Sequence, residues 1–317
     1  MRVALVSVDG RKYPNLALMK IAAYHKRRGD SVSWFLPLFK YDRVYASKVF
    51  TFTPDCPYLP PDTIKGGTGY DVRSKLPPDI EKCPPDYSIY PEFTAAYGFL
   101  TRGCCNRCPW CVVPKKEGAL KVVSDIETVA QGRKNVVLMD NNFLAAPFEY
   151  VREQMERAGK LGLRLDFNQA TDARLYNERT ARIMARVNYL RYMRVSCDTD
   201  MQIPAVCNAV ELMRGYGYKG EVFCYVLATN EGIESAKYRI AKLTEFDPKI
   251  VPFVMPFRSL SDNSIIPNDE LKRLARWCNK PWLRKSCRFE DLGKLETHGA
   301  GGDLFAALYS EPAPPVG

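Results

Sequence analysis

The pattern of apolar and polar positions divides the chain into parts with different rhythms. The first 58 residues alternate short apolar runs with one helical repeat, which predicts a small α/β unit. Residues 59–93 are rich in Pro and Gly and poor in periodic pattern, which indicates a connector. The elements predicted in the first unit are a strand at 2–8, a helix at 15–28 and strands at 31–36 and 43–51.

From residue 94 to residue 260 apolar runs and amphipathic stretches alternate regularly. Six strands separated by five helices predict parallel strands with right-handed crossovers, and hence an α/β fold built on a partial (β/α)6 barrel. Functional residues are then expected at the carboxyl ends of the strands. The predicted strands are 95–101, 135–140, 163–168, 192–197, 221–228 and 250–256, and the predicted helices are 124–133, 147–160, 177–187, 202–215 and 232–246.

The C-terminal part has a different character. A helical extension is predicted over residues 261–295, with a basic amphipathic helix at 269–278. Residues 296–317 contain clustered Gly and Pro and are expected to form a flexible tail.

The chain is strongly basic, with a formal net charge of +10. Basic residues concentrate at 179–194 and 271–288, which favours an anionic partner such as nucleic acid or a phosphorylated substrate. Solvated helix faces are the other interpretation of the same pattern. No run of about 18 apolar residues and no signal peptide is seen, so we expect a cytoplasmic protein without a membrane partner.

Four of the eleven cysteines crowd into residues 104–111, and three of them have the spacing Cys104-x3-Cys108-x2-Cys111. Three thiolates on a tight loop can bind three irons of a cubane and leave the fourth iron open. Structural zinc is the alternative, but it usually takes four ligands, and no second cysteine pair or histidine pair is present. Cys105 is expected to be a packing residue. A second cluster on the scattered cysteines matches no ligand spacing; these are Cys56, Cys83, Cys278 and Cys287.

The segment around these cysteines resembles the radical S-adenosylmethionine (SAM) superfamily, whose motif is C-x3-C-x-aromatic-C. Trp110 occupies the aromatic position. The resemblance implies a [4Fe–4S] cluster that binds SAM through its open iron, and a one-electron reductant such as flavodoxin or ferredoxin.

The same resemblance implies that the ends of later strands bind SAM. Where the family often has Gly-Gly-Glu, this chain has Asp140 and Asn142, which offer oxygens to the amino group of methionine, although chain turning or helix capping would also explain this segment. Cys197 is interpreted as a packing residue that could instead donate a hydrogen atom. The remaining expected contacts are Asn168, Gln169, Ser196 and Asp198 as polar groups, and Val254 and Met255 at the adenine.

The segment before the barrel resembles the reduced form of a cobalamin-binding, Rossmann-like domain, the mark of one subgroup of the superfamily. The Asp-x-His-x-x-Gly motif that ligates cobalt is missing, so bound cobalamin is not expected. The stretch GGTG at residues 66–69 is interpreted as a turn rather than as a phosphate cradle.

These features predict an enzyme that cleaves SAM reductively and abstracts hydrogen from an unidentified, anionic substrate. A radical methyltransferase or a nucleic-acid-modifying enzyme of the same superfamily is the alternative. The methylthio-transferring enzymes are disfavoured, because they need a second three-cysteine cluster. An alternative of another class is a non-catalytic nucleic-acid-binding protein whose fold is stabilised by a bound metal.

Overall fold

The computed structural model describes residues 1–259 and 265–292. The predicted tail at 296–317 lies outside these ranges, as do the parts of the predicted extension at 261–264 and 293–295. Among the described helices, none combines the length and the apolar content needed to cross a membrane.

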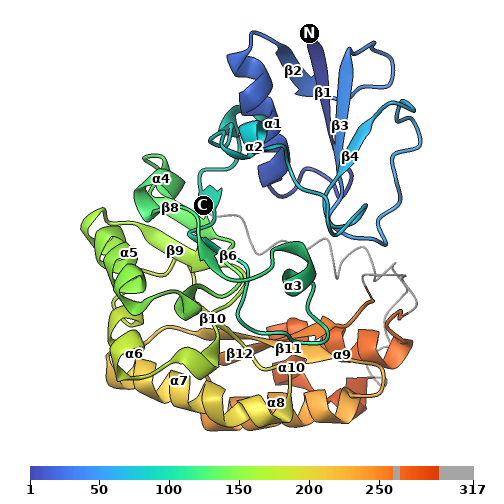
Figure 1. Ribbon diagram of the computed structural model, residues 1–317. Helices are drawn as coiled ribbons and strands as arrows, with labels where there is room; N and C mark the ends of the chain where they lie inside the picture. The colour runs from blue at the N-terminus through green and yellow to red at the C-terminus, as the bar shows by residue number, and fades with distance from the viewer. Residues whose placement is uncertain (260–264, 293–317) are drawn as a thin grey trace.

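The N-terminal unit is a four-stranded parallel sheet with the order β2-β1-β3-β4, and helix α1 packs on one face of it (Figure 1). The side chain of Asn15 caps α1 by accepting from the Leu18 backbone N–H. His25 of α1 is buried and satisfied, because its two ring nitrogens lie 2.7 Å from Asp30 and 3.0 Å from the Tyr45 hydroxyl. The elements are β1 (Arg2–Ser7), α1 (Leu16–Arg27), β2 (Ser31–Trp34), β3 (Arg43–Ser47) and β4 (Ile64–Gly66).

Strand β4 lies in the segment that the sequence indicated to be an irregular connector, so the sheet extends beyond residue 58. The stretch that follows is a turn, as predicted. Gly67 has a φ of +96°, and a Cβ there would lie 2.4 Å from the Lys48 carbonyl oxygen. A Cβ on Gly69 would lie 2.8 Å from the Phe50 carbonyl oxygen. These glycines therefore allow two backbone segments to approach closely, and nothing in this geometry points to a phosphate site.

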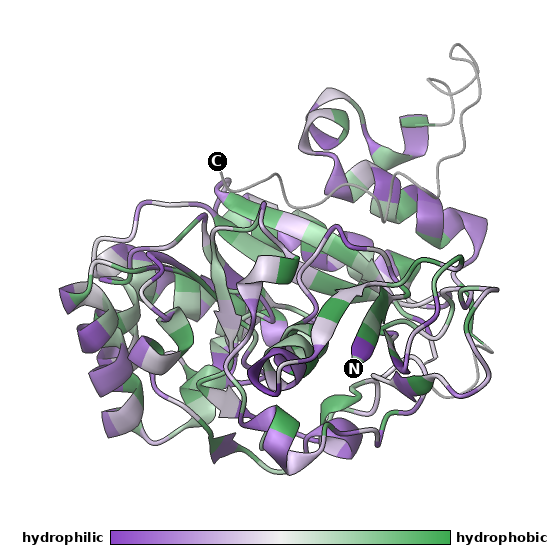
Figure 2. Cartoon of the chain, turned by 90° about the horizontal axis from the view of Figure 1, so that it is seen from above, coloured by the Kyte–Doolittle hydropathy of each residue, from purple (hydrophilic) through white to green (hydrophobic). Residues whose placement is uncertain are grey.

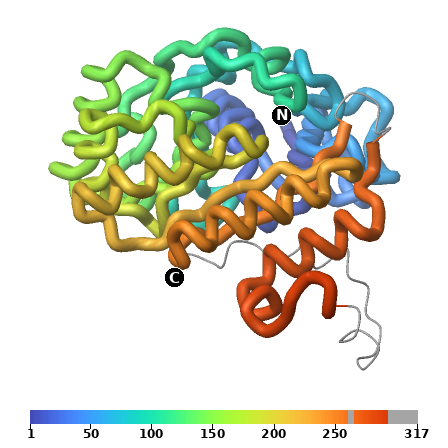
Figure 3. The backbone as a smooth tube through the Cα atoms, turned by 90° about the horizontal axis from the view of Figure 1, so that it is seen from below, coloured from blue at the N-terminus to red at the C-terminus, as the bar shows by residue number. Residues whose placement is uncertain are grey.

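Six parallel strands form the second unit in the order β5-β8-β9-β10-β11-β12. Two three-stranded sheets are joined by bridges between Leu165 and Tyr189 and between Thr171 and Val195. Figure 3 shows the chain following an arc, with the helices outside the strands. The strands are β5 (Ala96–Gly98), β8 (Asn135–Leu138), β9 (Arg164–Phe167), β10 (Met193–Ser196), β11 (Val222–Ala228) and β12 (Ile250–Pro256).

All six predicted strands and all five predicted helices between them are present. The main difference is in the first strand, which breaks after β5 and continues as the short β6 (Thr101–Arg102), paired antiparallel with β7 (Lys121–Val122). The helices between the strands are α4 (Ile126–Ala130), α5 (Phe148–Lys160), α6 (Glu178–Met184), α7 (Ile203–Gly215) and α8 (Ile233–Phe246); the motif is followed by α3 (Val113–Lys116).

The strands β11 and β12 alternate between two faces. In β11, Val222, Cys224 and Val226 are fully buried and belong to the main core, whereas Phe223 and Tyr225 between them are half-buried. Figure 2 shows green, apolar segments along the strands and purple, polar segments on the surrounding helices. The buried face packs under the helices, since α8 contacts both strands. The opposite face therefore lines the inside of the arc.

The C-terminal extension closes the free edge of β12. Asn279 at the end of α9 accepts from the Val254 N–H at 2.7 Å and donates to the Val254 carbonyl at 3.0 Å. An uncovered strand edge would expose unpaired backbone groups, and this side chain satisfies two of them. The extension consists of α9 (Asp269–Asn279), α10 (Pro281–Ser286) and the turn Phe289–Asp291.

The two units pack against each other at several places. Met19 of α1 belongs to the barrel core, and the Arg258 guanidinium, just after β12, lies 4.5 Å from the ring centre of Phe52. The connector adds α2 (Pro78–Glu81) and the turn Tyr87–Ile89. The N-terminal unit is therefore a packed neighbour of the barrel and is drawn directly beside it in Figure 1. Its kinship with Rossmann-like or cobalamin-binding domains stays a prediction.

Candidate functional site

The three motif cysteines lie on one loop between β6 and α3. Gly103 begins this loop with a φ of +85°, and a Cβ there would lie 2.3 Å from the Ala119 carbonyl oxygen. The backbone N–H of Cys104 donates to the Gly118 carbonyl at 3.2 Å. The loop is therefore closed at its base by the β6–β7 ribbon, and only glycine fits where the two segments cross.

Cys104, Cys108 and Cys111 are half-buried, whereas Cys105 is exposed. The expectation that Cys105 packs in the interior is therefore wrong, because its side chain faces solvent. The Cys104 sulfur lies 3.3 Å from the Asn106 N–H, and the Cys111 sulfur lies 3.5 Å from the Val113 N–H. Hydrogen bonds to sulfur tune the properties of cysteine-ligated clusters.

Burial raises the pKa of Cys108 and of Cys111, so both thiols favour the protonated form unless positive charge is added. A group that carries cations and binds thiolates would reverse this preference. The donor set of three neighbouring thiols with N–H groups on two of the sulfurs therefore fits an iron–sulfur cluster.

Within residues 1–259 and 265–292, no three Cys, His, Asp or Glu side chains converge closely enough to hold a single metal ion. This finding concerns one ion. In a cubane each thiolate binds a different iron, so the sulfurs stand farther apart than they do around one zinc ion.

The end of β8 supplies two residues with different surroundings. Asp140 is 2% exposed, and its carboxylate accepts from the backbone N–H groups of Leu100 and Thr101 and from the Thr101 hydroxyl. Burial raises its pKa to about 6 despite these hydrogen bonds. Asp140 therefore anchors the break between β5 and β6. A contact with methionine stays a prediction, and these bonds count against it.

Asn142 faces the cysteine loop. Its amide nitrogen lies 3.5 Å from the Cys104 sulfur and 3.2 Å from Asp172 Oδ2. Its amide oxygen is buried and has no hydrogen-bond partner among the described residues. A buried acceptor without a partner is costly, which indicates that a donor from outside the described structure completes it.

The segment after β9 connects to the same loop through Asp172. This carboxylate accepts from Asn106 at 3.0 Å and from Arg174 at 2.8 and 2.7 Å. Burial opposes its ionisation, but the hydrogen bonds from Arg174 and Asn106 hold its pKa below the usual value. Asp172 and Arg174 therefore form an ion pair that also fixes the cysteine loop. In the sequence, the only feature that points to a role for Asn106 is its position between the motif cysteines.

Two other residues expected at this strand end are less engaged with the loop. Gln169 is exposed, and Asn168 is half-buried, with its backbone carbonyl accepting from the Tyr225 hydroxyl at 3.1 Å. Their expected contacts with SAM stay predictions.

The end of β10 brings Asp198 to the motif. The Trp110 side chain lies near the Asp198 carboxylate and favours its ionised form, but burial raises the pKa of this carboxyl overall. Ser196 is half-buried on the inner face of the strand. The aromatic position of the motif therefore reaches a strand end that lies about 90 residues later in the chain.

Cys197 does not face the inside of the arc. It is fully buried in the core shared with the helices, and burial raises its pKa to about 12. This burial agrees with the packing interpretation and counts against the hydrogen-donor interpretation, which stays a prediction. Arg239 of α8, which the sequence analysis missed, donates to the Cys197 carbonyl at 2.6 Å and lies 3.2 Å from Asp200.

At the end of β12, the backbone of Val254 is already bonded within the protein. Both of its backbone groups are bonded to Asn279, and its side chain is fully buried. These bonds count against the expected contact of this backbone with adenine, which stays a prediction. Met255 beside it is 43% exposed, so its expected packing on adenine stays a prediction.

No second cysteine site forms in the described ranges. Cys278 is buried in α9 with its thiol against the Pro252 carbonyl, whereas Cys83 follows α2 in the connector. The two therefore lie on different units.

Comparison with known proteins adds little to this geometry. No protein-family model matches the chain, and no curated protein matches it. A crystal structure of methylornithine synthase (PylB) aligns with a TM-score of 0.41 at 14% identity, over 61% of this chain and 64% of that chain. The chain thus spans slightly less than two thirds of that protein. Similarity at this level carries no functional argument, so function has to be argued from the residues.

Proposed function

We propose that this chain is a radical SAM enzyme. The observation that carries the proposal is the loop with Cys104, Cys108 and Cys111 at the carboxyl end of the first of six parallel strands, with Trp110 near Asp198. When bound to these thiolates, a [4Fe–4S] cluster would supply the electron that cleaves SAM into methionine and a 5′-deoxyadenosyl radical.

Asn142 is the best-supported contact for the amino-acid end of SAM. Its amide nitrogen is already directed at Cys104 and Asp172, which leaves its buried oxygen to accept from an ammonium group. This agrees with the expectation that the end of the second barrel strand meets the methionine amino group.

The charges around the loop favour a cationic ligand. Asp172 and Asp198 both act electrostatically on the motif thiols. Arg174 forms an ion pair with Asp172, whereas Arg239 and Arg174 act on Asp198 only from a distance. SAM carries a positive sulfonium and a positive ammonium group, so a site with an additional carboxylate would stabilise it. Asp198 would serve as an acceptor for the ammonium group or for the ribose hydroxyls.

The inner face of the arc is the expected substrate side. Tyr192 and Phe223 stack there with ring centres 4.9 Å apart, and Arg194 forms a buried ion pair with Asp166. The substrate itself is unidentified; an anionic molecule or a nucleic acid fits the net charge of +10. Flavodoxin or ferredoxin would supply the electron. Radical methyl transfer is the alternative outcome of the same chemistry, and bound cobalamin is not expected.

Anaerobic reconstitution tests the proposal. We expect about four irons per chain and dithionite-dependent formation of 5′-deoxyadenosine from SAM. The variant Cys108→Ala should lose both, whereas Cys105→Ala, which changes an exposed neighbouring thiol, should keep both. Bound zinc without SAM cleavage would overturn the proposal, and an unchanged iron content in Cys108→Ala would refute the ligand assignment.

A further inference from the structure

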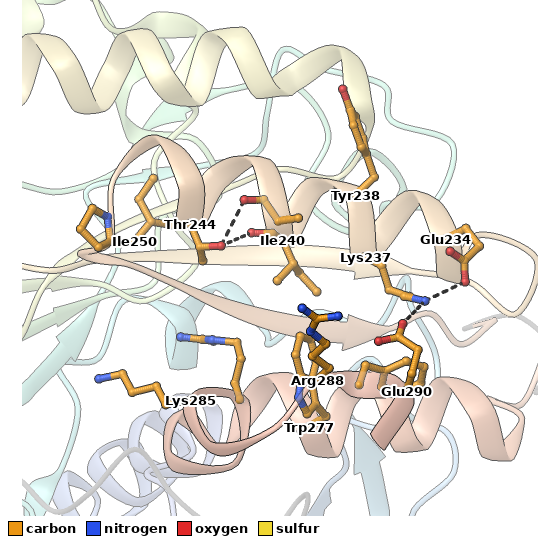
Figure 4. Close-up of a pocket in the computed structure, with 14 residues that line it drawn as sticks. Glu234, Lys237, Tyr238, Ile240, Thr244, Ile250, Trp277, Lys285, Arg288 and Glu290 are labelled. Carbon is orange, nitrogen blue, oxygen red and sulfur yellow. Dashed lines mark hydrogen bonds and ion pairs between the residues drawn. The ribbon is translucent and has the colours of Figure 1, made fainter. Parts of the chain in front are cut away.

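A second concave surface lies far from the cysteine motif in the fold. The α8–α10 groove, between α8 and the C-terminal extension, has a volume of about 660 Å³ (Figure 4). It opens on the helix-covered side of β12, since the buried Ile250 at the start of that strand contributes to its floor. Nothing in the proposed reaction uses this surface.

The positive charges of the groove differ in how they are compensated. Lys237 is neutralised, because its ammonium lies 3.1 Å from Glu234 and 2.8 Å from Glu290. Arg284, Lys285 and Arg288 line the same groove and form no ion pair with any residue in 1–259 or 265–292. Three cations within five positions repel one another, and a bound anion would relieve that repulsion.

Two of these three cations also have structural roles. Arg284 donates to the Cys278 carbonyl at 3.0 Å and to the Pro252 carbonyl at 3.3 Å, so it ties α10 to the barrel. Lys285 in the last turn of α10 also suits the negative end of the helix dipole. Arg288 lies beyond the helix, is exposed, and extends over Trp277 into the groove in Figure 4.

One exposed aromatic ring lies on α10 beside these cations, outside the residues that line the groove. Trp282 of α10 is 65% exposed and lies three residues before Lys285, which places both on one face of the helix. Tyr238 of α8, on the opposite wall, is 50% exposed, but its ring points away from α10 in Figure 4. Cations beside exposed π faces are the combination that binds single-stranded nucleic acid, since phosphates contact the cations while bases stack on the rings.

We infer that the α8–α10 groove binds single-stranded nucleic acid. Arg284, Lys285 and Arg288 would contact phosphates, and Trp282 would stack on a base. The inference is independent of SAM chemistry, because it uses no residue of the cysteine loop. It gives the chain a second activity, the capture of a nucleic-acid strand outside the barrel.

Fluorescence anisotropy with a labelled single-stranded DNA of about 20 nucleotides tests the inference on the full chain. Replacing Arg284, Lys285 and Arg288 together by Gln should weaken binding tenfold or more, and should reduce the slope of log K against log salt by about 2, or about 0.7 per lost phosphate contact. Trp282→Leu should weaken binding roughly fivefold with little change in that slope.

A matched control removes the same charge elsewhere. Lys160, Arg186 and Lys219 are exposed on other parts of the barrel, and replacing all three by Gln should leave affinity within about twofold. An equal loss in this control would show attraction by net charge alone and would overturn the inference. Tighter binding of duplex DNA than of the single strand would also overturn the inference. The same holds if acidic flavodoxin binds and the oligonucleotide does not. Cleavage of SAM without substrate should be unchanged in every variant, which separates this test from that of the proposed reaction.

Discussion

Asp140 and Asn142 lie two residues apart at the end of β8, yet their surroundings give them different functions. The Asp140 carboxylate accepts hydrogen bonds from the backbone N–H groups of Leu100 and Thr101. Asn142 keeps a buried oxygen without a described partner beside Cys104. The residue that best fits a ligand is therefore the neutral amide, and the charged residue organises the loop.

Asp140 should also make stability depend on pH. Its pKa is about 6 in the folded chain against 3.8 for the unperturbed group, so the folded protein binds this proton more tightly and loses stability as pH rises from about 4 to about 6. Relative to the non-titrating variant Asp140→Asn, the wild-type free energy of unfolding should fall by up to about 3 kcal/mol between pH 4 and 7. Urea denaturation of the iron-free protein measures this difference, and a constant difference would contradict the assignment.

Asp166 and Arg194 form a buried pair that should be costly to break on one side only. Their side chains are 8% and 5% exposed, with nitrogen–oxygen distances of 2.6 and 2.7 Å. Asp166→Leu should reduce the free energy of unfolding by about 3–5 kcal/mol, because Arg194 loses its counter-charge.

The double variant Asp166→Leu/Arg194→Met should be more stable than Asp166→Leu alone, because no buried charge is left uncompensated. The exposed pair Glu149 and Arg152 is the control, since Glu149→Leu should cost less than about 1 kcal/mol. Equal losses at the two sites would mean that the Asp166–Arg194 pair is not desolvated as the structure indicates.

At the scale of elements, α9 acts as the cover of an open barrel. An arc of six strands leaves β12 as an edge, and Asn279 caps the backbone of this edge at one residue. The buried cysteine of the same helix, Cys278, also places its thiol against the Pro252 carbonyl at 3.4 Å. The extension thus substitutes for the next strand of a closed barrel.

Asn279→Ala should therefore lower the free energy of unfolding by about 1–3 kcal/mol, because two backbone groups of β12 lose their partner. Asn188→Ala, at an exposed asparagine, should change it by less than about 0.5 kcal/mol. Chemical denaturation of both variants provides the comparison. An effect of equal size in both would show that water replaces Asn279 at this edge.

At the scale of the whole molecule, a chain of charges connects the N-terminal unit to the cysteine loop. Lys20 of α1 lies 2.7 Å from Glu81, Glu81 lies 2.9 Å from Arg102, and Arg102 forms a bidentate pair with Glu117. Arg102 immediately precedes the motif, and Glu117 follows it. The first unit therefore holds the loop from outside the barrel.

Replacing Arg102 by Gln should loosen the loop without unfolding the barrel. Amide hydrogen exchange in residues 99–118 should become roughly five to thirty times faster, since a partly buried network worth about 1–2 kcal/mol is lost. Arg152→Gln, at an exposed ion pair on α5, should leave exchange in that segment unchanged. Unaltered exchange in Arg102→Gln would show that the β6–β7 ribbon alone fixes the loop.

The sequence by itself determined the strands, the helices and the spacing of the cysteines, because these depend on side-chain periodicity and on neighbours within a few residues. The alternation of Met193, Val195 and Cys197 as an apolar set also indicates the helix-facing side of β10.

Only the tertiary structure decided the partners of Asp140 and Val254 and the contact of Asp172 with Asn106, because these residues lie about 25–66 positions apart in the sequence. Contacts over such separations depend on how the sheet curves and on what covers its edge, and local pattern contains neither. The same is true of the chain of charges through Arg102, which joins two units that the sequence could only delimit.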